Sequence, residues 1–216
     1  MFVGHYGPSL AAKAVNKTIP LWVLFLAVQW MDVCWTVLVL LGIEKVRIVP
    51  GITAANPLDL YYMPYSHSLP AAVLWSVAAA VVYGLLAKPG NGSAPVIVGA
   101  AVFSHWILDL VVHRPDLALY DNTLKVGLGL WNYPLASFLV ESGVLLGGLY
   151  LYMRTTTPVT RGGRYAMVVF AAILVAVQGL SILGPPPPSV KAMALTGLVS
   201  YITLTAIAYW LGPKRE

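Results

Sequence analysis

APVIVGAAVFSHWILDLVV, residues 94–112, is an apolar stretch interrupted near its end by the polar side chains of His105 and Asp109. The hydrocarbon core of a bilayer is about 30 Å thick and is crossed by about 20 consecutive apolar residues in a helix. The spacing of four residues places His105 and Asp109 on one face of such a helix, about 6 Å apart. The stretch therefore predicts a transmembrane helix that carries an imidazole and a carboxylate side by side.

The composition of the whole chain agrees with a membrane protein. Of its 216 residues, 59% are hydrophobic and only 10% are charged, and the mean hydropathy is +0.79. Soluble domains carry about 25% charged residues, so a soluble globular fold is excluded. We expect a single integral membrane domain over residues 1–216, because six spans leave no room for a separate soluble domain.

Six apolar runs are long enough to cross a bilayer. They predict an all-α fold, a polytopic bundle of about six transmembrane helices, or five if the N-terminal part is re-entrant. The six runs are Ile19–Ile43, Leu69–Ala87, Ala94–Val112, Pro134–Met153, Tyr165–Leu183 and Val190–Leu211.

The basic residues give the orientation and argue against a nucleic-acid partner. If all six runs cross, eight Lys and Arg, including Lys88, fall on the side of the termini, and five fall on the opposite side. The positive-inside rule then predicts a multi-pass protein of the inner (cell) membrane with both termini cytoplasmic. The net charge of +5 arises from basic residues scattered singly between apolar runs, which is typical of contacts with lipid headgroups. The lone Cys34, inside an apolar run, indicates packing.

Acidic residues inside the spans point to a functional site. An Asp or Glu in the middle of a membrane helix costs about 2.5–3.5 kcal/mol and persists mainly where it faces the bundle interior. Asp109, His105 and Glu141 are predicted about 5–10 Å from the non-cytoplasmic end of their spans, and Asp32 about 16 Å. His67 precedes the second span at the same end. These residues are expected to share one layer.

The residue types in this layer are those that bind a transition metal. Imidazole and carboxylate are ligands of Zn²⁺, Mn²⁺ and Fe²⁺, and catalytic sites use three or more of them. The set is sufficient for one ion or for two ions, with Zn²⁺ preferred. Other readings stay open: Asp32 could bond Gln29, and His5 could lie on the surface of a short amphipathic helix.

The loops at the non-cytoplasmic end supply further candidates. Asp59 and Glu141 are candidate bases that would take a proton from water, although Asp59 could instead cap a turn and Glu141 could orient a ligand. A substrate-binding group is predicted at Arg114, Lys125, His113 and Asp116. Its basic side chains are placed to hold a phosphate. The alternative for His113 is an interfacial residue.

Several strings in the first 140 residues resemble the bacterial membrane-bound metal-dependent hydrolases, also described as LexA-binding, inner-membrane-associated hydrolases. The resemblance implies hydrolysis of a phosphoester or related bond, with metal ligands in an order similar to that of zinc-dependent phospholipase C. The ligands it implies are His5, Asp32, His67, His105 and Asp109. The strings are Gly4-His5-Tyr6-Gly7, Gln29-Trp30-Met31-Asp32, Tyr65-Ser66-His67-Ser68, Ser104-His105-Trp106-Ile107-Leu108-Asp109 and His113-Arg114-Pro115-Asp116.

The implied ligand His5 conflicts with the predicted topology. If the N-terminus is cytoplasmic and the first span crosses once, His5 lies on the opposite side of the bilayer from His67. Either the N-terminal segment is re-entrant, which requires its backbone to be buried in protein, or His5 is not a ligand.

Two classes of function compete at this stage. The preferred prediction is a metal-dependent hydrolase that acts on a phosphoester or other lipid-like substrate at the membrane. The alternatives are a small transporter coupled to protons or divalent cations, and an interaction protein with a structural metal. The cytoplasmic halves of the third to sixth spans are almost wholly apolar, which favours a one-sided site. Whether the glycine-rich stretch 144–148 packs inside the bundle or against another copy is left open.

Overall fold

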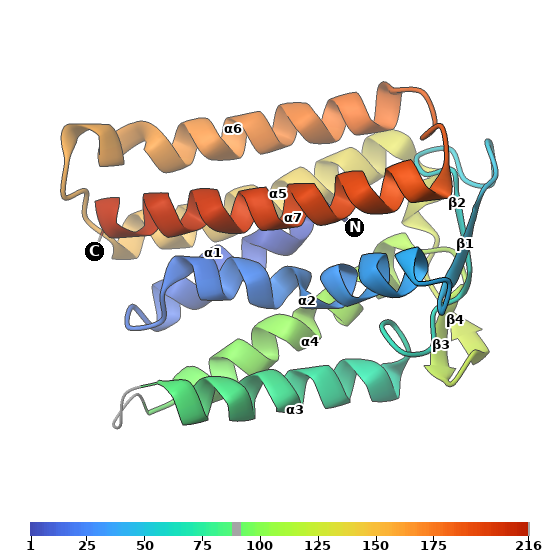
Figure 1. The fold of residues 1–216 in the computed structure, drawn as a ribbon. Helices are drawn as coiled ribbons and strands as arrows, with labels where there is room; N and C mark the ends of the chain where they lie inside the picture. The colour runs from blue at the N-terminus through green and yellow to red at the C-terminus, as the bar shows by residue number, and fades with distance from the viewer. Residues whose placement is uncertain (88–91, 216) are drawn as a thin grey trace.

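The computed structural model describes residues 1–87 and 92–215, so Lys88 of the charge count lies outside the described residues. Six helices of the described chain are long and apolar enough to cross a membrane, which confirms the predicted helical bundle (Figure 1). They are α2 (Leu21–Leu40), α3 (Leu69–Leu86), α4 (Ala94–Val112), α5 (Pro134–Thr155), α6 (Arg161–Leu183) and α7 (Val190–Leu211).

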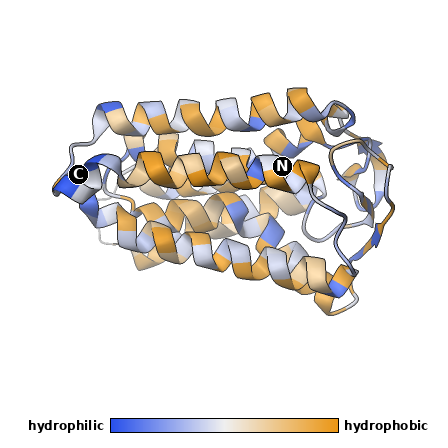
Figure 2. Cartoon of the chain, turned by 90° about the horizontal axis from the view of Figure 1, so that it is seen from above, coloured by the Kyte–Doolittle hydropathy of each residue, from blue (hydrophilic) through white to orange (hydrophobic). Residues whose placement is uncertain are grey.

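Some helices begin or end at different residues from the predicted apolar runs, because particular residues at their ends stop or start the helix. α2 starts only after Pro20 and is followed closely by Gly42, whose φ of 72° is left-handed and suits a residue without a Cβ. α6 begins four residues before the predicted run because the Thr160 hydroxyl accepts a bond from the Gly163 N–H at 3.0 Å. Figure 2 shows apolar residues along the helices and hydrophilic residues gathered at the ends of the bundle.

The N-terminal segment begins inside the bundle. It forms η1 (Val3–His5) and α1 (Tyr6–Val15), and the backbone of this segment is covered by α5 and α2. In Figure 1, α1 runs from the middle of the bundle to the end where the C-terminus lies, and α2 starts back from that end. The N-terminal segment therefore lies within the bundle, as a re-entrant segment requires, and six helices long enough to cross a membrane follow it in the described chain.

A close contact between two glycines holds α1 against α5. A Cβ added to Gly148 would collide with the backbone of Gly7, and one added to Gly7 would collide with the backbone of Val144. By contrast, a Cβ on Gly147 meets nothing within 4 Å. Part of the glycine-rich stretch thus packs within the bundle, where small residues let two helix backbones approach.

Two antiparallel hairpins close the end of the bundle opposite the C-terminus (Figure 1). The first joins β1 (Lys45–Ile48) to β2 (Leu58–Tyr62), and its register shifts between Lys45 and Arg47. The second joins β3 (Leu117–Tyr120) to β4 (Thr123–Val126). These hairpins belong to the loops that follow α2 and α4.

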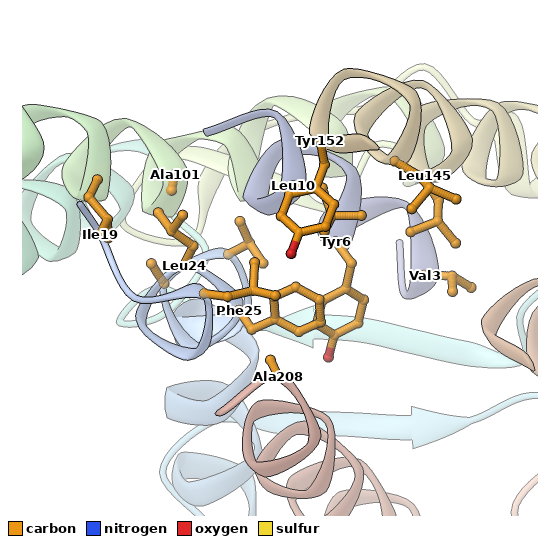
Figure 3. Close-up of a cluster of buried hydrophobic side chains, with 14 of the residues drawn as sticks. Val3, Tyr6, Leu10, Ile19, Leu24, Phe25, Ala101, Leu145, Tyr152 and Ala208 are labelled. Atoms are coloured by element: carbon orange, nitrogen blue, oxygen red, sulfur yellow. The ribbon is translucent and has the colours of Figure 1, made fainter. Parts of the chain in front are cut away.

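The half of the bundle nearer the C-terminus is filled by an apolar core. Tyr6 and Leu10 of α1 pack among Phe25, Leu145 and Tyr152, and each of these side chains is at most 1% exposed (Figure 3). Such a dense interior has no room for an aqueous path.

Candidate metal centre

All four histidines of the chain converge on one carboxylate, that of Asp109. On one of its oxygens, Oδ1, the Nε2 atom of His5 lies at 3.1 Å. Around the other oxygen, Oδ2, three Nε2 atoms gather: His105 at 3.1 Å, His67 at 3.6 Å and His113 at 3.6 Å. Asp109 and the four imidazoles are all at most 3% exposed.

Three segments far apart in the sequence bring these groups together. His105 and Asp109 lie one turn apart on α4, and His113 follows the last turn of the same helix. His67 stands just before α3, in a turn closed by a bond from its own N–H to the carbonyl of Met63. The short helix η1 supplies His5 from the buried N-terminal segment.

A second carboxylate, Asp32 of α2, completes the cluster. Its Oδ1 atom lies 3.5 Å from Nε2 of His67 and 3.7 Å from Nε2 of His105. Two triads in the described chain have ligand atoms within 4.8 Å of one another, and they share His105. The triads are His5, His105 and Asp109, and Asp32, His67 and His105.

Three of the imidazoles are oriented through the nitrogen that faces away from the cluster. Nδ1 of His105 donates to the carbonyl of Val28 at 2.7 Å, and Nδ1 of His113 donates to Oδ1 of Asp116 at 2.8 Å. Since the proton of a neutral imidazole is then on Nδ1, each Nε2 presents a lone pair to the cluster. Metal-binding histidines are oriented in this way by carbonyls and carboxylates.

His67 is oriented by a chain of two hydrogen bonds. Its Nδ1 atom lies 2.7 Å from the Ser66 hydroxyl, which itself donates to Oε2 of Glu44 at 2.5 Å. Because the hydroxyl proton is used by Glu44, Ser66 accepts from Nδ1 of His67. Glu44 also accepts the backbone N–H groups of Tyr65 and Ser66, so the relay is built into the turn.

When the imidazoles are neutral, the Nε2 lone pairs of His67, His105 and His113 face the Oδ2 atom of Asp109. Nε2 of His105 is without a hydrogen-bond partner among the described residues, although Oδ2 of Asp109 is only 3.1 Å away. A lone pair opposite a carboxylate oxygen is repulsive unless a cation or a proton lies between the two atoms. The same geometry holds for His67 and His113, so the donor set fits a divalent transition metal.

His5 contributes in a different manner from the other three histidines. Its ring stacks on that of His105, with centroids 3.7 Å apart, and its Nδ1 atom has no partner among the described residues. The amino group of Met1 donates to the same Asp109 oxygen at 2.6 Å. The burial of η1 removes the topological objection to His5, but its ring is held through Nε2 on Asp109 itself, and not through Nδ1 as the other three rings are.

Glu141 of α5 holds the N-terminal segment in this position. Its Oε2 atom accepts the N–H of Phe2 at 2.9 Å and that of Gly4 at 3.4 Å. The nearby Gln29 amide donates to the Phe2 carbonyl at 3.2 Å. Glu141 therefore lies beside the cluster, where its first role is to support η1.

Asp59 and the basic candidates lie outside the cluster, in the loops of the hairpin end. One Asp59 oxygen accepts Nε of Arg47 at 3.0 Å and Nη2 at 2.6 Å, and the other pairs with Arg114. Arg114 also approaches Asp116 at 3.4 Å. Lys125 donates to the carbonyl of Tyr61 at 2.7 Å, and burial lowers the pKa of its ammonium group. These residues join the two hairpins to each other.

A cavity of about 640 Å³ lies against the cluster and reaches the loops of the hairpin end. Asp32, His67, Asp109, His113 and Glu141 line it, whereas Asp59, Arg114, Asp116 and Lys125 are not among the described residues that do. Of the predicted substrate-binding residues, the structure therefore places His113 at the cavity. Pockets of 300–1,000 Å³ are the size that binds small molecules.

Three residues of this site were not predicted from the sequence. Glu44 follows the first span directly before Lys45, so it looks like an ordinary charge at the membrane interface. Gln178 of α6 is 5% exposed and lines the cavity, and its amide inside an apolar run was a usable signal. Tyr201 of α7 also lines the cavity, but an aromatic residue in a membrane helix gives no such signal.

Comparisons with known proteins do not assign the chain to a family. No family model matches it, and neither a curated protein nor a solved structure is significantly similar to it.

Proposed function

We propose that the protein is a membrane-embedded, metal-dependent hydrolase that acts on a phosphoester or other lipid-like substrate. One observation carries the proposal: three imidazoles, each with Nδ1 facing an acceptor, direct Nε2 at the buried carboxylate of Asp109 and, for two of them, at the half-buried carboxylate of Asp32. The similarity of the His and Asp strings to bacterial membrane-bound metal-dependent hydrolases adds support. Zn²⁺ is the preferred ion, with Mn²⁺ or Fe²⁺ as alternatives, in one or two copies.

The residues that would hold the ion follow from the contacts. His67, His105 and His113 would bind through Nε2, and Asp32 and Asp109 through their carboxylates. A divalent ion would balance the two carboxylates in a place where unpaired charge is costly. His5, on the other oxygen of Asp109, is the candidate ligand for a second ion.

When bound, such an ion polarises the scissile ester and lowers the pKa of water toward about 7. The chain must then supply a proton acceptor beside the cluster. Glu141 lines the cavity and suits this role, whereas Asp59 is bound by two arginines in the loops. We therefore propose Glu141 as the base and Asp59, Arg114 and Lys125 as the residues that hold the hairpins in place.

The position of the cluster favours hydrolysis over transport. A transporter needs a polar route to both faces of the membrane, yet the half of the bundle nearer the C-terminus is filled by the apolar core around Tyr6 and Phe25. The adjoining cavity also argues against a purely structural metal, because structural sites are closed.

We propose a bacterial inner membrane as the location, with the C-terminus in the cytoplasm. The support is the distribution of Lys and Arg: Arg154 lies in the last turn of α5, and Arg161 and Arg164 lie at the start of α6, at the end where the C-terminus lies. In this orientation the cluster and the hairpins are on the non-cytoplasmic side.

The decisive experiment is elemental analysis of protein purified in mild detergent without chelators, combined with phosphoesterase assays. We expect about one to two equivalents of a transition metal, and hydrolysis that is lost on chelation and restored by Zn²⁺ or Mn²⁺. A folded, reloaded protein without metal would overturn the proposal. Metal-loaded protein that hydrolyses no ester but takes up metal into liposomes would establish the transporter instead.

A further inference from the structure

The cavity beside the cluster has a second wall inside the membrane. Besides the loops, it is lined by Gln178 and Ser181 of α6 and by Thr196, Ser200 and Tyr201 of α7. These residues come from the two helices farthest along the chain. The cavity therefore extends from the His and Asp cluster to the space between α6 and α7.

The two helices that flank this space are held by different neighbours. α7 packs extensively on α2, while α6 packs mainly on α5, and direct contact between α6 and α7 is slight. Figure 1 shows α6 at the outer edge of the bundle, with α7 in a separate position. The cavity therefore borders the seam between α6 and α7, and we refer to this seam as the side opening.

This opening lies at the depth of the hydrocarbon core. Thr196 and Ser200 stand six and ten residues after Val190, which corresponds to about 9 and 15 Å along α7. On the same helix, Val199 is 62% exposed and Ile202 is 56% exposed, as expected for side chains that contact lipid. The hydroxyl-bearing face that lines the cavity thus borders a lipid-facing surface.

We propose that the space between α6 and α7 admits the hydrocarbon chain of a membrane phospholipid and places its phosphoester against the cluster. The inference rests on the proposed function and names the substrate class. Apolar lining residues such as Trp35, Leu180 and Met193 would contact the chain. The Ser200 and Tyr201 hydroxyls and the Gln178 amide would meet the polar groups at its junction with the head.

The reaction needs no reagent besides water. The oxygen of water attacks phosphorus, one P–O ester bond breaks, and the departing alcohol takes up a proton. Without a bound cation the carboxylates of Asp32, Asp109 and Glu141 would repel a phosphate, so the cation and the phosphate are recruited together.

The test blocks the side opening and compares it with a matched control. In a Cys34→Ser background, Ser200→Cys and Val199→Cys are purified and then alkylated with a bulky thiol reagent, so that folding precedes the block. Ser200→Trp and Val199→Trp give a reagent-free comparison. Vesicles of phosphatidylcholine that contain phosphatidic acid with a photoreactive acyl chain provide the lipid probe.

We expect photolabel on peptides that contain Gln178 and Tyr201, reduced at least about tenfold when position 200 is blocked and unchanged when position 199 is blocked. The variants blocked at position 199 should still hydrolyse a water-soluble phosphodiester, because Val199 does not line the cavity and the cluster is left intact. Labelling that is equal in the two variants, or confined to the loop 50–58, would overturn this inference. Loss of all hydrolysis with labelling preserved would instead contradict the proposed function.

Discussion

The Nε2 atom of His105 lies 3.1 Å from Oδ2 of Asp109, one turn further along α4, while Nδ1 of the same ring donates to the carbonyl of Val28. When the imidazole is neutral, its proton is therefore on Nδ1, and Nε2 and the carboxylate oxygen face each other as acceptors. Both are buried, and solvent does not relieve the repulsion. The proposed metal ion would remove this repulsion, and the predictions below test its presence from several sides.

Asp109→Asn should abolish metal binding while keeping the shape of the site. The amide has the size of the carboxylate but no charge, and it costs less to bury in a membrane, so the protein should insert and fold. We expect metal content to fall below stoichiometric levels and hydrolysis to fall by orders of magnitude. His105→Ala should behave alike.

Asp121→Asn is the matched control, because Asp121 is exposed at a turn whose φ of 49° suits Asn. Elemental analysis, turnover and thermal melts on all three variants make the comparison. Full metal occupancy in Asp109→Asn would contradict the assignment.

Asp116→Asn should weaken metal binding without removing a ligand. Asp116 accepts the Nδ1 proton of His113 at 2.8 Å, and loss of such a partner typically lowers metal affinity about 10–100-fold. Arg114→Gln is the control, since it removes ion pairs of the same loop without touching His113. Competition with a fluorescent chelator measures both affinities, and equal values in the two variants would exclude His113 as a ligand.

Glu44→Gln should weaken metal binding indirectly, through Ser66 and His67. The amide can donate to the Ser66 hydroxyl, which would turn that hydroxyl proton toward Nδ1 of His67 and favour the wrong tautomer. We expect a loss of about 10–100-fold in metal affinity. The exposed neighbour Lys45→Gln should leave affinity unchanged. A purely structural role for Glu44 would lower the melting temperature and leave the affinity of the folded protein intact.

Gly148→Ala should separate α1 from α5. The added methyl group would overlap the backbone of Gly7, and overpacking of this kind costs about 1–3 kcal/mol. Gly147→Ala, one residue earlier and facing open space, should be neutral or slightly stabilising. Chemical denaturation in detergent micelles compares the two. Equal stability would show that α1 does not depend on this contact.

The orientation can be tested with single cysteines in a Cys34→Ser background. Leu128→Cys lies in an exposed loop of the hairpin end, and Arg161→Cys is exposed at the start of α6. If the Lys and Arg count is correct, a membrane-impermeant thiol reagent added to intact cells labels only position 128. The reverse pattern would place the cluster on the cytoplasmic side.

The six apolar helices and the pairing of His105 with Asp109 can both be predicted from the sequence. Both depend on short-range properties: an apolar run long enough for the bilayer must form a helix, and residues four apart on a helix share a face. The shared layer of Asp32, His67 and Glu141 also followed, because distance from a span end converts directly into depth.

Which loop and terminal residues lie in that layer depends on tertiary packing and cannot be predicted from the sequence. His5 reaches Asp109 because Gly7 and Gly148 let α1 enter the bundle, a contact between residues more than a hundred positions apart. Asp59 is instead held by Arg47 and Arg114, and it lies away from the cluster. Sequence spacing carries no information about such contacts, because the path of a loop is set by the packing of the helices it joins.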